Sequence, residues 1–211
     1  MHYSVPLRTG VLAAAVSLCL SAQTPPNEAK GLPPRATPAD YQVQAKAGAL
    51  TIAAEFKAHS FPDQQGPLTS EEYVAVEVGV FGARGTISFA DFSLRINGKK
   101  GTPAVQFGMV ASTVKNPEWE PPIPVEPKSK GGINAGGGGG QGNEPVTPPK
   151  PTFAEQRGWS QRALKAMLPE GDRPLPQAGL LFFQYRGQTK GIQTVDLVYE
   201  GPAGKATLKL Q

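Results

Sequence analysis

The sequence predicts an all-β fold, an antiparallel β-sandwich with one short helix and a long disordered insertion rich in proline and glycine. Segments in which apolar and polar residues alternate occur on both sides of that insertion, and a period of two is typical of half-buried strands. Turn-forming residues separate these segments. The chain contains 25 glycines and 22 prolines, well above ordinary usage, and its 39% hydrophobic residues are enough for a core.

The N-terminal residues 1–22 have the features of a signal peptide. Arg8 precedes an apolar run from Val11 to Leu20, and small residues follow it up to Ala22. We therefore expect cleavage near Ala22 and a secreted or periplasmic protein. The apolar run is about half the roughly 20 residues that cross a bilayer, so we expect no permanent membrane span.

Cys19 is the single cysteine and lies in this leader. Lipid attachment at Cys19 is one alternative, but Leu18 stands where such cleavage sites have a small residue, so we favour a leader residue that is discarded. The remaining chain then has no thiol for a disulfide or for zinc. Positive residues are interspersed with acidic ones, at a formal charge of +4 for the whole chain, which argues against a nucleic-acid partner.

Residues 23–39 contain five prolines and almost no large apolar side chain, so we predict a Pro-rich tether. The first part of the sandwich is predicted to span residues 40–114, beginning with strands at residues 41–46 and 50–56. The clearest strand is Tyr73–Phe81, in which four valines share one face that must be buried. The valines are Val74, Val76, Val78 and Val80, and the other face carries Tyr73, Ala75, Glu77 and Gly79.

Two further strands and a hairpin are expected before the insertion. Strands at residues 86–89 and 92–96 are followed by Asn97-Gly98, the dipeptide best suited to a type I′ turn. We therefore predict a hairpin to a strand at residues 103–109, in which Val105, Phe107 and Met109 alternate with other residues. Pro103 restricts this strand to a sheet edge or places the proline at its first position.

Residues 115–151 break the alternating pattern. Clustered prolines and a run from Gly136 to Gly140 predict a disordered, solvated insertion. A spacer explains this composition, and the alternative is an extended polyproline ligand for an extracellular partner. We expect a single domain because the segments after the insertion supply strands that the segments before it need.

Residues 152–211 are predicted to supply a short helix and the remaining strands of the same sandwich. Thr152 and Glu155 have the spacing of a capping box, and Pro169 ends the helix. Strands follow at residues 179–185, 194–199 and 205–210, a pattern that indicates an antiparallel meander. The total of seven to nine short strands is the number expected of an immunoglobulin-like sandwich.

Three segments resemble bacterial secreted immunoglobulin-like domains related to the immunoprotective extracellular antigen family. Tyr73–Phe81, residues 91–100 and residues 179–200 match the Y-V-x-V-x-V strand, the D-F-x-L-x-x-x-G-K hairpin and the late G-x-L-x-F strand of that family. These motifs are structural. The resemblance therefore implies a fold and a secreted protein of a family largely without known function, and it assigns no catalytic residue.

Candidate catalytic and metal-binding residues are sparse. His59 is the only histidine after the leader, and Asp63 alone does not complete a triad or a metal site, so we predict an ordinary turn residue. Glu71-Glu72 and Glu170-Gly-Asp172 lack the spacing of a calcium loop and are predicted to be solvated turns and helix ends. We therefore predict no catalytic residue, no metal site and no cofactor.

The candidate binding residues are the aromatic side chains of Trp119, Trp159, Tyr185 and Tyr199. Exposed aromatic rings of exported β-sandwiches stack on sugars or dock partners. The alternative is that both tryptophans pack over the sandwich where the insertion leaves and rejoins it. A shared exposed concave surface would favour binding.

The function expected from these features is that of an exported, non-catalytic binding or adhesion module at the cell envelope. Its partner would be a protein or a polysaccharide of the envelope. One alternative is a structural or accessory subunit that lends an edge strand to an envelope assembly. A small hydrolase is the third possibility, and it would need clustered carboxylates or a Ser-His pair in a cleft.

Overall fold

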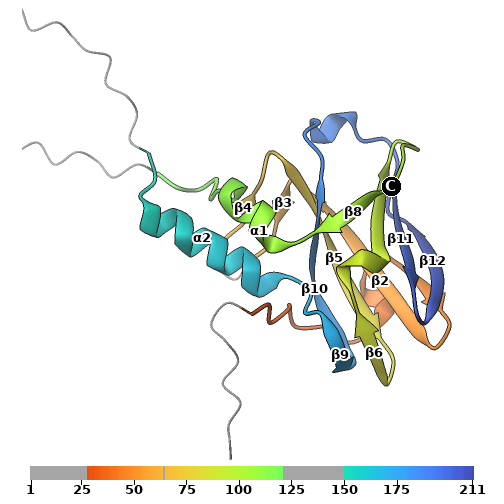
Figure 1. The fold of residues 1–211 in the computed structure, drawn as a ribbon. Coiled ribbons are helices and arrows are strands. Elements are labelled where there is room, and N and C mark those ends of the chain that lie inside the picture. The colour runs from red at the N-terminus through yellow and green to blue at the C-terminus, as the bar shows by residue number, and fades with distance from the viewer. Residues whose placement is uncertain (1–27, 64, 121–149) are drawn as a thin grey trace, which may run out of the picture.

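The computed structural model describes residues 28–63, 65–120 and 150–211 (Figure 1). The predicted signal peptide with Cys19, the beginning of the tether and most of the predicted insertion lie outside the described residues, so those expectations stay predictions. The described chain is mostly antiparallel β-sheet with few helices, which confirms the all-β prediction. None of the described helices is long and apolar enough to cross a membrane.

The elements are numbered along the chain. The strands of the described residues are β1 (Val43–Ala47), β2 (Leu50–Ala58), β3 (Ser60–Phe61), β4 (Leu68–Thr69), β5 (Tyr73–Phe81), β6 (Arg84–Ile87), β7 (Phe92–Ile96), β8 (Thr102–Val105), β9 (Gly171–Pro174), β10 (Gln177–Gln184), β11 (Val195–Gly201) and β12 (Gly204–Lys209). The α-helices are α1 (Phe107–Val110) and α2 (Phe153–Ala166), and the 3-10 turns are η1 (Pro38–Asp40), η2 (Phe89–Asp91), η3 (Ala111–Thr113) and η4 (Thr189–Gly191).

Eight strands form one sheet in the order β1-β2-β5-β10-β8-β7-β11-β12, and neighbouring strands are antiparallel. Strand β10 follows the insertion in sequence, yet it lies between β5 and β8, which precede the insertion. Strand β11 likewise pairs with β7. The segments before and after the insertion therefore build a single sheet.

The sheet curls so that its first and last strands lie side by side. Strand β1 contacts β12, and the Gln42 side chain donates a hydrogen bond to the carbonyl oxygen of Leu210. Gly48 comes so close to the last hairpin that a Cβ at this position would lie 2.0 Å from the Ala203 carbonyl oxygen. The arrangement is barrel-like, and the two edges of the sheet shield each other from pairing with another chain.

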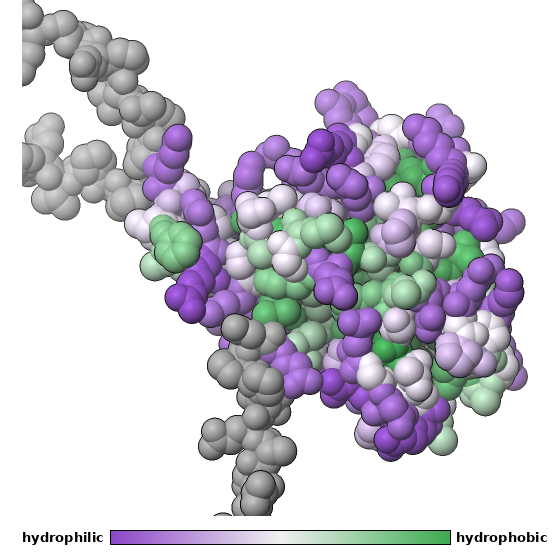
Figure 2. Space-filling view, in the orientation of Figure 1, coloured by the Kyte–Doolittle hydropathy of each residue, from purple (hydrophilic) through white to green (hydrophobic). Residues whose placement is uncertain are grey.

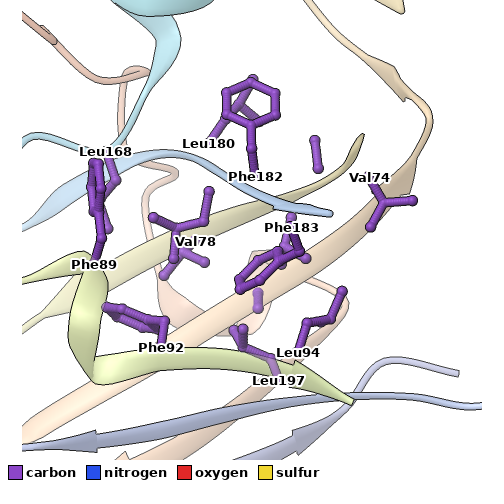
Figure 3. Packing of buried hydrophobic residues seen from close by; sticks show 14 of the residues in the cluster. Val74, Val78, Phe89, Phe92, Leu94, Leu168, Leu180, Phe182, Phe183 and Leu197 are labelled. Carbon is purple, nitrogen blue, oxygen red and sulfur yellow. The ribbon is translucent and has the colours of Figure 1, made fainter. Parts of the chain in front are cut away.

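The main core lies inside the curled sheet. In Figure 3, Val74 and Val78 of β5 and Phe183 of β10 face Leu94 of β7 and Leu197 of β11. Each of these side chains is at most 1% exposed. The prediction that the valine face of Tyr73–Phe81 is buried is confirmed, and this apolar burial is the largest favourable contribution to folding.

The opposite face of β5 is buried as well, which the alternation of residues did not predict. Tyr73, Ala75 and Glu77 are at most 6% exposed. Phe182 of β10, the cross-strand partner of Ala75, packs edge-to-face on Phe61 with 5.1 Å between ring centroids. Helix α2 lies beside β10, and its buried side chains belong to the same apolar cluster (Figure 1). A second apolar layer therefore covers this wall of the sheet.

Part of the predicted tether, residues 23–39, packs on the sheet. The Leu32 amide donates to the carbonyl oxygen of Ala178 at 2.8 Å. The guanidinium carbon of Arg35 lies 4.4 Å from the centroid of the Tyr41 ring. From residue 28 onward this segment is a strap across the sheet, which differs from the extended spacer predicted. The physical reason is that its few apolar and cationic side chains find partners on the folded domain.

Two local predictions are confirmed at atomic detail. Asn97 and Gly98 have φ angles of 53° and 68°, and the Lys99 amide donates to the Ile96 carbonyl oxygen, as a type I′ turn requires. Thr152 accepts from the Glu155 amide at 3.3 Å while the Glu155 carboxylate accepts from the Thr152 amide at 2.6 Å. This capping box begins α2.

The predicted strand at residues 103–109 is wrong beyond Val105. Strand β8 pairs with β7 through Thr102 and Pro103, and with β10 through Ala104 and Val105. The ladder ends there, so the chain turns into α1, and Met109 is 54% exposed instead of facing the core.

The predicted meander of the last three strands is also wrong. Strands β11 and β12 pair as predicted, but β10 pairs with β5 and β8 because the hairpin of β7 and β8 lies between β10 and β11.

Asp172, predicted in a solvated turn, lies in β9 instead. It pairs with Arg84 of β6 at 2.8 Å in a small two-stranded sheet. Strand β6 ends at Ile87, so it covers only the first half of the strand predicted at residues 86–89, and Phe89 begins η2 instead.

Candidate binding pocket beside helix α2

A pocket of about 610 Å³ lies where the described chain stops at Glu120 and resumes at Lys150. One wall is the first two turns of α2, and the other is the segment from Ala111 to Trp119. We call it the tryptophan pocket. It is lined by Ala111, Ser112, Val114, Lys115, Asn116, Trp119, Pro151, Phe153, Gln156, Arg157, Trp159 and Ser160.

Both tryptophans of the chain line this pocket. Their rings meet edge-to-face, with 6.4 Å between centroids and 71° between planes, a favourable aromatic geometry. Trp159 is 8% exposed and belongs to the buried cluster, whereas Trp119 is only partly buried. Trp159 therefore anchors the pocket to the core, and Trp119 presents a ring to solvent.

Glu155 connects the pocket to the helix start. One carboxylate oxygen accepts a hydrogen bond from Trp119 Nε1 at 2.9 Å, and the other accepts from the amide and the hydroxyl of Thr152. These hydrogen bonds hold the pKa of Glu155 below its ordinary value, and the bond from Trp119 contributes most to this lowering. The capping box thus also fixes the Trp119 ring.

The wall opposite α2 is tied to strand β4 and to α2 itself. Thr69 of β4 and Lys115 exchange two backbone hydrogen bonds of 2.9 Å each. The Ser160 hydroxyl of α2 donates to the Ala111 carbonyl oxygen at 2.6 Å, and the Lys115 ammonium pairs with Glu71. The pocket is therefore held between two fixed walls, as expected of a preformed ligand site.

The rim of the pocket carries an exposed aromatic ring and an exposed cation. Phe153 is 79% exposed, and Arg157 follows it by one helical turn. The Arg157 side chain has no ion pair with the described residues. Neither residue was among the predicted binding residues, although their spacing of four on a predicted helix places them on one face.

The other two predicted binding residues lie elsewhere. Tyr185 is partly buried at the end of β10, where its ring lies 5.9 Å from that of His59. Tyr199 is 2% exposed and packs on Phe92 at 5.1 Å, and burial followed by the nearby charge of Asp91 raises its pKa. The structure therefore brings together Trp119 and Trp159, but not Tyr185 or Tyr199.

His59 occupies the turn between β2 and β3, and its ring is engaged on both sides. Nδ1 lies 2.7 Å from the Ser70 carbonyl oxygen and 3.0 Å from that of Tyr73, and Nε2 lies 2.8 Å from that of Gly187. The ring thus joins two loops of the fold. Among the described residues there is no group of three or more His, Cys, Asp and Glu side chains that could hold a metal.

A four-residue charge network was not predicted. Glu55 and Glu77 are directly opposite each other on β2 and β5, and both carboxylates contact Arg35 and Lys57. Glu77 is only 6% exposed. Two cations balance the two acids, so this carboxylate pair is a structural element and not the open acid–base pair of a glycosidase.

No protein-family model matches the chain, and neither a curated protein nor a solved structure matches it significantly.

Proposed function

We propose that this chain is an exported, non-enzymatic binding module of the cell envelope, related to immunoglobulin-like domains, and that its ligand site is the tryptophan pocket. The observation that carries this proposal is the convergence of Trp119 and Trp159, which lie 40 residues apart in sequence, on one preformed pocket with the exposed Phe153 at its rim. A volume of about 610 Å³ is within the usual range for ligand sites.

The contacts of the charged groups in and beside the pocket support binding over catalysis. Glu155 is held by Trp119 and Thr152, and Lys115 is paired with Glu71. A general acid or base needs a side chain that is free to exchange a proton with the substrate. Here the contacts of Glu155 and Lys115 hold the walls of the pocket in place instead.

The relation to immunoglobulin-like domains is supported by the way the curled sheet packs on itself. The wall formed by β2, β5 and β10 faces the wall formed by β7 and β11 across one apolar core (Figure 3). Two facing antiparallel walls with short strands are the basis of a sandwich. Export is supported by the apolar segment that precedes Ala22.

The alternative of an accessory subunit that lends an edge strand receives less support. The terminal strands β1 and β12 lie against each other, so the large sheet offers neither of them as a free edge.

Binding to envelope material tests the proposal. The purified full-length protein is co-sedimented with insoluble cell-wall material and compared with Trp119→Ala. We expect the wild-type protein to sediment with the wall and the variant to lose at least ten-fold in affinity. Tyr185→Phe is the matched control, because Tyr185 lies outside the pocket, and it should bind like wild type. Equal binding of wild type and Trp119→Ala would overturn the proposal, as would a turnover reaction abolished by one substitution.

A further inference from the structure

The tryptophan pocket is one end of a longer groove. It shares Arg157 and Ser160 with a second cavity of about 410 Å³. That cavity in turn shares Gln106, Phe107 and Leu164 with a third, of about 270 Å³. Because adjacent cavities share lining residues, the three lie in a row along α2, and we call this row the α2 groove.

One face of α2 forms a side of the α2 groove. Phe153, Arg157, Ser160 and Leu164 follow each other at intervals of three or four residues, which places them on one helical stripe. Helix α2 has 14 residues, which correspond to a length of about 21 Å. Figure 2 shows apolar surface at the start of α2 and again beside its C-terminal half and over α1. The ligand that fits this shape is an extended chain.

The lining favours sugar rings over an apolar peptide. Aromatic rings occur at intervals, with Trp119 and Phe153 at one end and Phe107 farther along. Between them lie the amide side chains of Gln106 and Gln161. Aromatic faces stack on the apolar faces of sugar rings, and an amide both donates to and accepts from hydroxyl groups. An apolar helix or strand would leave these amides buried without partners, which is costly.

The charges of the α2 groove select an acidic ligand. Glu28 and Arg173 pair with each other, and the Glu170 carboxylate accepts from the Phe89 amide. Lys115 is also paired, with Glu71. Arg157 is exposed, lies where the first two cavities meet, and has no ion pair within the described ranges. A guanidinium in this position matches a carboxylate in a bidentate geometry.

We propose that the α2 groove binds a linear glycan that carries carboxylate groups, with one carboxylate on Arg157 and sugar rings stacked on the aromatic side chains on either side. This inference rests on the proposed function of the tryptophan pocket and adds the class of ligand. The source of selectivity is Arg157, because the other two cations of the lining, Lys115 and Arg173, already have acidic partners among the described residues.

The test compares matched acidic and neutral glycans. Oligomers of galacturonate, of mannuronate and of the glucuronate-containing hyaluronan repeat are each titrated into the full-length protein beside their methyl esters, which keep the rings and remove the charge. Tryptophan emission is the readout, because both tryptophans line the groove. We expect at least one acid to bind ten-fold or more tightly than its ester, and hexamers to bind more tightly than dimers.

Variants then assign the charge selectivity to one residue. Arg157→Gln should bring the affinity for the acid down to that for the ester. Arg95 is an exposed arginine on β7 outside the groove, so Arg95→Gln should leave the affinity for the acid unchanged. Three results would overturn the inference: equal binding of acids and esters, an unchanged preference for the acid in Arg157→Gln, or no binding of any acid at millimolar concentration. Those results would leave the proposed function standing if sedimentation with cell wall still depended on Trp119. The proposed function would fail by itself if Trp119→Ala sedimented like wild type.

Discussion

Trp119 Nε1 donates a hydrogen bond of 2.9 Å to the carboxylate of Glu155, the same residue that completes the capping box of α2. Two residues 36 positions apart in the sequence are thus joined at the point where the helix begins. The bond places the Trp119 ring edge-to-face with Trp159. The stability of the helix start and the shape of the tryptophan pocket therefore depend on one side chain.

Acidification should release Trp119. The bonds from Trp119 and Thr152 depress the pKa of Glu155, so they persist above the ordinary glutamate value of about 4.3 and are lost as pH falls through the lower value in the folded protein. We expect a change in tryptophan emission in that acidic range. Glu155→Gln, which keeps the capping geometry but cannot ionise, should show no such transition. An identical pH profile in wild type and variant would contradict this assignment.

Removing Arg35 should destabilise the protein more than an ordinary surface substitution. Arg35→Ala leaves the buried Glu77 and the opposing Glu55 with Lys57 as their remaining partner. We expect a loss of about 2 kcal/mol in the free energy of unfolding, less than for a fully buried pair because Arg35 is partly exposed. Urea denaturation measures this loss, and Arg35→Ala combined with Glu55→Gln should recover part of it. A loss below about 0.5 kcal/mol would show that the network behaves like exposed charges.

The charge network should also make stability depend on pH. Burial alone would raise the pKa of Glu55, but hydrogen bonds from Lys57 and Arg35 lower it below its ordinary value. A carboxyl with a depressed pKa stabilises the fold above its unfolded value of about 4.3, and this contribution disappears as pH falls through the folded value. The advantage of wild type over Glu55→Gln, measured by urea denaturation, should therefore be largest near neutral pH and vanish in acid. A constant difference would contradict the prediction.

Gly179 should tolerate no side chain. A Cβ at this position would lie 2.3 Å from the amide nitrogen and 2.4 Å from the Cα of Leu168, so backbone would have to move. We expect Gly179→Ala to lose about 3 kcal/mol of stability through overpacking. Gly158 in α2 is the matched control, because no atom lies within 4 Å of its added Cβ. Gly158→Ala should stabilise the protein by about 0.5–1 kcal/mol through helix propensity. Thermal unfolding of both variants should show a lower midpoint for Gly179→Ala and a higher one for Gly158→Ala.

Loss of the His59 ring nitrogens should loosen the loop after β10. His59→Phe keeps a ring beside Tyr185 but withdraws hydrogen-bonding groups from the carbonyl oxygens of Ser70, Tyr73 and Gly187. We expect a loss of about 1–3 kcal/mol and faster amide hydrogen exchange at residues 186–192. Gln188→Ala, which removes an exposed side chain of the same loop, is the control. Its loop amides should exchange at wild-type rates. Unchanged exchange in His59→Phe would show that the ring does not hold this loop.

Local features were predictable from the sequence because short-range physics decides them. The type I′ turn depends on two residues that tolerate positive φ, and the capping box on two side chains three residues apart. The buried valine face of β5 likewise depends on alternation within one strand. Each of these signals lies within fewer than ten residues.

The candidate site was predictable only in part. Residue type singled out the two tryptophans, yet the same reasoning also selected Tyr199, which is buried, and Tyr185, which lies elsewhere. The neighbouring residues in the sequence do not show whether an aromatic ring will meet another ring 40 residues away or pack elsewhere in the fold. The strap residue Arg35 carried no signal, because its acidic partners lie on strands about 20 and 40 residues away.

The sequence by itself determined most of the longer strands, where α2 begins and how the hairpin at Asn97-Gly98 turns, and it singled out the two tryptophans. Tertiary structure alone decided that β10 pairs with β5 and β8, that the chain leaves the sheet after Val105, and that Trp119, Trp159 and Arg157 share one groove. The reason is physical. Backbone propensity acts between near neighbours, whereas strand pairing and pocket shape depend on the packing of segments far apart in the chain.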